Sequence, residues 1–224
     1  MILNAKKFFS ESDVSKIENR IRDIEKDTSG EIVVYVASKS ARYLDIIFAA
    51  AMLLSLTLSY SAVRVLPLFS YRVENLLSIF HGLDVFLLFF LSLFIFFYFL
   101  LRHFPSFCGP FISRKRKLME TEQKALQAFY ENALYRTKDE TGILLLISLL
   151  ERRIYLLADR GILGKIDKED LSAYVENISV GIRGNDAANT ICAVIDDLGR
   201  TLKREFPAKD GNPNELSDRV VIES

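Results

Sequence analysis

The strongest pattern along the chain is a pair of apolar runs, residues 46–63 and 85–101, in which no charged side chain occurs. At about 1.5 Å of rise per residue, a helix over either run covers roughly 26 Å, close to the ~30 Å hydrocarbon core of a bilayer. The pattern therefore predicts two transmembrane helices, over about 44–63 and 83–101. Because the residues between them are too few to fold alone, the helices should form a hairpin with both chain termini on one side of the membrane.

The residues before this hairpin carry two other patterns. Val14, Ile17, Ile21 and Ile24 recur at intervals of three and four, which predicts one amphipathic helix. Residues 32–37 form a short β-branched run, typical of a strand that is covered on both faces. One helix and one strand cannot form a stable sheet by themselves. Their partners are therefore expected after the hairpin.

The chain after the hairpin supplies further strands and helices. Two apolar runs, 143–150 and 154–158, are joined by a short polar turn, which predicts an antiparallel strand pair. Three helices are indicated by apolar residues at helical spacing: Leu118, Leu126, Phe129 and Ala133; Leu171, Tyr174, Val175 and Ile178; and Ile191, Ile195, Leu198 and Leu202.

Strands this apolar need helices on both faces. The sequence therefore predicts an α/β fold, an α/β/α sandwich on a small mixed sheet that is interrupted by a two-helix transmembrane hairpin. Residues 1–43 would supply the first helix and strand, 44–101 the hairpin, 102–206 the remainder of the domain, and 207–224 a polar C-terminal tail.

Charge adds an orientation to this architecture. The 29 lysine and arginine residues balance 29 aspartate and glutamate residues, and no basic and aromatic surface suggests a nucleic acid partner. Close to the predicted membrane ends the cations are unequal, with seven on the terminal side and two in the loop: Lys39, Arg42, Arg102, Arg114, Lys115, Arg116 and Lys117, against Arg64 and Arg72. Because such residues favour the cytoplasmic side, we expect a multi-pass protein of the cell inner membrane with its domain and both termini in the cytoplasm.

The first span carries small residues, Ala51, Ser55 and Ser59, at intervals of four. Small residues let helices approach closely, so the stripe is either the packing seam of the hairpin or a homo-oligomer contact. Neither span carries an acid, a base or a proline midway, which favours an anchor over a transport pathway.

Four segments form a familiar series: residues 28–36, 141–149, 151–162 and the Gly-Asp segment at 183–186. Together they resemble the TPM-domain family, which occurs in bacterial membrane proteins and in a thylakoid protein of photosystem II repair. The resemblance implies a role in maintaining membrane protein complexes and, for some members, calcium binding and weak acid phosphatase activity. The chain departs from the family pattern at residues 44–101, which replace the usual connection, and at Leu163, where an acid is usual.

Two groups of residues are candidates for function. Carboxylates near the glycine loops could bind calcium or another metal, or could simply cap helices and solvate loops: Asp139, Glu140, Asp159 and Asp186. Basic residues at the membrane end of the sheet could contact anionic lipid or a partner, or form a solvated rim: Arg102, Arg114, Lys115, Arg116, Lys117, Arg152 and Arg153.

A catalytic residue cannot be named, because no histidine, cysteine or serine lies in a nucleophile pattern. The sequence therefore favours a membrane-anchored binding or accessory module for a membrane protein complex. The alternative is a metal-dependent, calcium-linked acid phosphatase.

Overall fold

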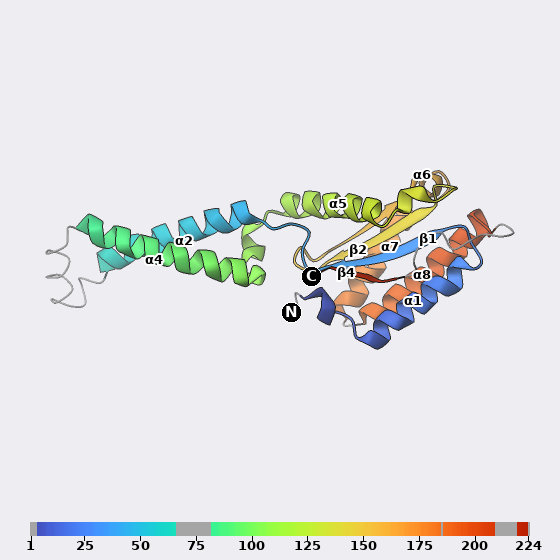
Figure 1. The fold of residues 1–224 in the computed structure, drawn as a ribbon, viewed down its shortest axis with the longest axis horizontal. Coiled ribbons are helices and arrows are strands. Elements are labelled where there is room, and N and C mark those ends of the chain that lie inside the picture. The colour runs from blue at the N-terminus through green and yellow to red at the C-terminus, as the bar shows by residue number, and fades with distance from the viewer. Residues whose placement is uncertain (1–3, 66–81, 185, 209–218, 224) are drawn as a thin grey trace. The chain divides into compact units, whose positions relative to one another are not determined.

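The computed structural model describes residues 4–65, 82–184, 186–208 and 219–223. The chain divides into two compact units, one formed by Met1–Ala41 together with Lys115–Ser224 and the other by Arg42–Arg114 (Figure 1). The strands of the described residues all lie in the first unit, and the described part of the second unit is helical. The second unit is thus an insertion within the chain of the first.

A four-stranded mixed sheet with the order β3-β2-β1-β4 forms the centre of the first unit. β1 (Glu31–Ala37) and β2 (Gly142–Ser148) run parallel and are paired over their whole length. β3 (Arg153–Ala158) returns antiparallel to β2, as the short turn predicts. β4 (Val221–Glu223) pairs in parallel with the other edge of β1. A polar tail was predicted over 207–224, but residues 221–223 of this segment form an edge strand of the sheet.

Helices cover both faces of this sheet, which confirms the predicted α/β/α sandwich. α1 (Glu11–Glu25), α7 (Lys168–Arg183) and α8 (Ala187–Glu205) cover one face, and α5 (Arg114–Glu131) covers the other (Figure 1). The helix predicted before β1 begins after Ser10, whose side chain and that of Asp13 form a reciprocal capping box.

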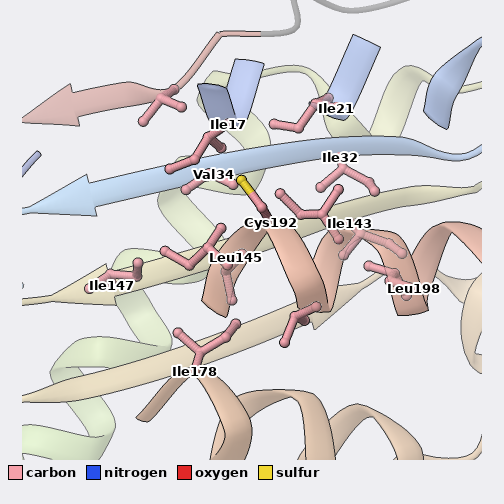
Figure 2. Packing of buried hydrophobic residues seen from close by; sticks show 14 of the residues in the cluster. Ile17, Ile21, Ile32, Val34, Ile143, Leu145, Ile147, Ile178, Cys192 and Leu198 are labelled. Atoms are coloured by element: carbon pink, nitrogen blue, oxygen red, sulfur yellow. The ribbon is translucent and has the colours of Figure 1, made fainter. Parts of the chain in front are cut away.

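Alternate residues of β1 enter two separate cores, because successive side chains of a strand point to opposite faces. Ile32 and Val34 pack with Ile17 and Ile21 of α1 in the larger core, where Leu198 of α8 also lies (Figure 2). Val33, Tyr35 and Ala37 face the smaller core with Ala125, Ala128 and Phe129 of α5. The β-branched run is therefore buried on both sides.

The buried face of α5 differs from the one expected. Leu118 and Leu126, taken as core positions, are 38% and 49% exposed. The face that the sheet covers consists of small and polar residues with one phenylalanine: Thr121, Lys124, Ala125, Ala128 and Phe129. A small-residue face permits close approach to the sheet, and it requires a partner for the buried lysine.

The second unit contains α2 (Leu44–Val65), α4 (Gly82–His103) and the 3-10 segment η3 (Pro105–Phe111). α2 and α4 pack along each other, with Phe48 and Phe94 in edge-to-face contact at 5.3 Å. Both helices are long and apolar enough to cross a membrane. The loop of the predicted hairpin, with Arg72, lies outside the described residues.

The small-residue stripe of α2 lies in the seam between the two helices. Ala51, Ser55 and Ser59 are each fully buried in the single chain. Of the two interpretations of this stripe, the structure therefore displays the hairpin seam, and a homo-oligomer contact through these residues would require the helices to separate. The outward side chains are large and apolar, with Leu88 72% and Phe99 63% exposed.

Candidate functional site

A cleft of about 830 Å³ opens in the first unit at the end of β2. Its walls come from the residues before α1, the end of β2, the turn between β2 and β3, the end of α7 and the start of α8. We call it the basic cleft and define it by its lining: Phe8, Phe9, Asp13, Ile147, Ser148, Leu149, Arg152, Arg153, Ile154, Ser179, Ile182, Arg183, Asp186, Ala187, Ala188 and Asn189.

The charged side chains of the basic cleft are predominantly cationic. The lining contains three arginines, Arg152, Arg153 and Arg183, and two carboxylates, Asp13 and Asp186. Within the described part of the chain, none of the three guanidinium groups pairs with a carboxylate, and the Nε of Arg183 donates to the carbonyl oxygen of Ser179 at 3.2 Å. The cleft therefore presents positive charge that is not neutralised by an ion pair.

The two carboxylates already have hydrogen-bond donors of their own. The Ser10 hydroxyl and backbone N–H both donate to Asp13, and these bonds lower the pKa of the Asp13 carboxyl. Asp186 accepts a bond from the Asn189 amide at 2.5 Å. Asp186 is the N-cap of α8, but its side chain does not cap the backbone. The first turn of α8 therefore adds its partial positive charge to the cleft wall.

A buried carboxylate holds the turn beneath these arginines. Glu151 is 4% exposed. It accepts the backbone N–H of Ser40 at 3.0 Å and the hydroxyl of Ser148, and the hydroxyls of Ser40 and Ser148 are 2.8 Å apart. This network holds the turn between β2 and β3, in which the backbone of Arg152 adopts a left-handed φ of 54°. It also ties the chain after β1 to the end of β2.

The sequence interpretation placed the Glu151 turn at this end of the sheet but did not recognise that Glu151 is buried, and it did not place Arg183 here. A Glu-Arg-Arg turn has the composition of a solvated turn, so nothing in it marks the glutamate as buried. The signal available was the pair of serines, Ser40 and Ser148, placed just after one strand and at the end of its predicted neighbour.

The four acids of the predicted metal site do not form one group, and this corrects the sequence interpretation. Asp139, Glu140 and Asp159 lie at the start of β2, where the Asp159 N–H donates to the Gly142 carbonyl at 2.9 Å. Asp186 lines the basic cleft with Ser148, six residues along β2, or about 20 Å at ~3.3 Å per residue. Among the described residues, no three histidine, cysteine, aspartate or glutamate side chains could hold a metal ion together.

At the start of β2, Asp159 has a structural role through its side chain, and Asp139 and Glu140 have one through their backbone carbonyl groups. The Asp159 side chain accepts the N–H of Arg160 at 2.8 Å and begins the short helix α6 (Arg160–Leu163). The Gly161 N–H donates to the Glu140 carbonyl oxygen at 3.0 Å. A Cβ at Gly161 would lie 2.4 Å from the Asp139 carbonyl oxygen, so the loop needs glycine for this approach.

The predicted basic surface is divided between the two units. Arg152 and Arg153 lie in the basic cleft, and Lys115, Arg116 and Lys117 lie in the first turns of α5, where Arg116 pairs with Glu120 at 2.7 Å. Arg102 and Arg114 belong to the second unit, and Arg102 donates to the Tyr98 hydroxyl at 3.1 Å.

Comparisons with known proteins add to the fold and leave the activity open. No family model and no curated protein matches the chain. A solved structure that it resembles is the NMR structure of the BA42 protein from the psychrophilic bacterium Bizionia argentinensis, with a TM-score of 0.57 over 96% of each chain and 15% sequence identity. At this identity the likeness shows a shared fold.

Proposed function

We propose that this protein is a membrane-anchored binding or accessory module with a TPM-like domain on the cytoplasmic side of the cell inner membrane, serving a membrane protein complex. One observation carries the proposal: a pair of helices able to cross a membrane is inserted between β1 and α5. The parallel pairing of β1 with β2 remains complete from Glu31 to Ala37. An insertion that leaves the host domain intact has the character of an anchor.

The side chains support binding more than catalysis. In the basic cleft, the polar lining consists of arginine, aspartate, asparagine and serine. Ser148 in this lining donates to the Glu151 carboxylate, and among the described residues that line the cleft there is no histidine to complete a nucleophile set. TPM membership and the cytoplasmic orientation rest on the sequence resemblance and on the seven-to-two charge asymmetry.

The module is tested by purifying the full chain from membranes in a mild detergent and identifying the proteins bound at fixed stoichiometry. We expect a membrane protein partner whose recovery falls when Arg152 and Arg153 are both changed to glutamate. The matched control is Arg160→Glu, an exposed arginine at the other end of the sheet. Equal recovery with both variants would contradict a partner contact at this end.

Two further measurements separate the alternatives. A membrane-impermeant thiol reagent added to intact cells should label a cysteine introduced at Tyr71 and should not label one at Lys138, whereas the reverse pattern would invert the orientation. Hydrolysis of a phosphate monoester at acid pH, dependent on calcium and lost with Asp159→Asn, would replace the module by the phosphatase.

A further inference from the structure

We propose that the basic cleft is a binding site for one anionic phospholipid molecule, with its phosphate among Arg152, Arg153 and Arg183 and its glycerol and first acyl carbons against Phe8 and Ile182. This goes beyond a charged surface near a membrane, because it assigns a single ligand to a defined cleft. It rests on the membrane anchoring proposed above only for the source of the ligand.

The charge of the cleft selects an anion. Three arginines line it, and among the described residues no ion pair joins their guanidinium groups to a carboxylate. Both lining carboxylates already accept hydrogen bonds, Asp13 from Ser10 and Asp186 from Asn189. Guanidinium groups and the start of a helix are the donors that bind phosphate best in proteins. A neutral or cationic ligand would not neutralise the positive charge of these arginines.

The apolar wall selects an amphiphile over a simple ion. Phe8, Ile154 and Ile182 in the lining are partly exposed, and Phe9 and Leu149 in the lining are buried. The volume of about 830 Å³ is within the usual range of small-molecule sites, ~300–1,000 Å³, and is far larger than a phosphate ion requires. An anionic headgroup with attached apolar carbons can contact both the arginines and the apolar side chains of the lining.

The bilayer is the natural source of such a molecule. Ser40 is hydrogen-bonded to Glu151 beneath the arginine turn, and α2, the first helix able to span a membrane, begins four residues later at Leu44. The cytoplasmic leaflet is rich in anionic lipid and attracts exposed basic side chains. A chain anchored in this membrane therefore has anionic phospholipid available to bind in the cleft.

The test uses the full chain in a non-ionic detergent and three soluble probes: dihexanoylphosphatidylglycerol, dihexanoylphosphatidylcholine and inorganic phosphate. Native mass spectrometry counts bound molecules, and microscale thermophoresis measures Kd. We expect one phosphatidylglycerol per chain, bound about tenfold or more tighter than the other two probes, since loss of a charge-assisted contact changes Kd by about that factor. The double variant Arg153→Gln, Arg183→Gln should lose this binding, and Arg136→Gln, Arg160→Gln should keep it.

A second variant protects the test against a folding defect. Phe8→Ser leaves every charge in place. It should weaken the binding of phosphatidylglycerol and leave the affinity for inorganic phosphate unchanged. Equal affinity for phosphatidylglycerol and phosphatidylcholine, or binding that survives Arg153→Gln, Arg183→Gln, would overturn the proposal. Inorganic phosphate bound as tightly as the lipid would also overturn it, in favour of a free phosphate. Recovery of the chain in the soluble fraction would instead contradict the anchor and leave the binding result standing.

Discussion

The end of the chain should stabilise the domain through one ion pair, that of Lys124 with Glu223. Lys124 lies on the buried face of α5 with a side chain 7% exposed, and its Nζ is 2.6 Å from a carboxylate oxygen of Glu223 in β4. The same oxygen accepts the hydroxyl of Tyr35 at 2.8 Å. Glu223→Gln keeps the size of this side chain and removes its charge, which leaves the buried ammonium without a counter-ion.

The magnitude follows from the exposure of the two partners. Breaking a fully buried pair costs about 3–5 kcal/mol, and an exposed pair contributes about 0–1 kcal/mol. The carboxylate of Glu223 is 43% exposed, so solvent screens one partner and we expect Glu223→Gln to lower the free energy of unfolding by about 1–3 kcal/mol. In a Lys124→Met background the same change should cost below about 0.5 kcal/mol, because no buried charge remains.

Unfolding of the first unit can be followed through Cys192. This thiol is 7% exposed, and burial raises its pKa, so it reacts slowly until the unit opens. Modification of the full chain in detergent is measured against urea, and peptide mass spectrometry separates Cys192 from Cys108. The control is Asp27→Asn, which breaks a pair with Lys203 whose side chains are 58% and 63% exposed. A loss no larger than in this control, or equal in both Lys124 backgrounds, would refute the reasoning.

Three other predictions follow from local geometry. Gly161→Ala should lower stability by about 1–3 kcal/mol, because its Cβ meets a carbonyl oxygen of the preceding turn, whereas Gly164→Ala, 3.5 Å from the nearest such atom, should be tolerated in the same thermal unfolding assay. Burial, with the bond to a carboxylate, raises the pKa of Tyr35, so stability is intact below the unfolded pKa of ~10 and falls as pH rises above it; Tyr35→Phe should flatten that fall in pH-dependent urea titrations. Calcium should raise the melting temperature little, and a large rise abolished by Asp159→Asn but kept in Asp186→Asn would restore a calcium site at the start of β2.

The fold could be predicted because the patterns that specify it are local. Residues 32–37 are apolar without alternation, and this fits the two separate cores that β1 enters. The turn at 149–152 has only four residues, so β3 must return antiparallel beside β2. The helical stripe of Val14, Ile17 and Ile21 likewise needs only its own spacing.

The features that could not be predicted depend on contacts between distant residues. Lys124 looks like a surface residue until Glu223, ninety-nine positions later, supplies its partner. β4 has only three residues, and it is a strand because it pairs with the edge of β1 that β2 leaves open. Asp186 was placed with the wrong acids because the end of the sheet at which α8 begins depends on how α7 crosses it. Composition and spacing carry none of this information.

The position of the insertion also limits what it costs the fold. β1 and β2 must find each other across roughly a hundred residues, of which the second unit supplies more than half. For a flexible loop, each doubling of length raises the free energy of closure by only about 0.6 kcal/mol. For a hairpin the increase is smaller, because α2 and α4 lie side by side and bring its first and last residues together. A membrane anchor can therefore enter the crossover between two parallel strands without weakening their register, whereas the same residues placed within β1 would divide the sheet.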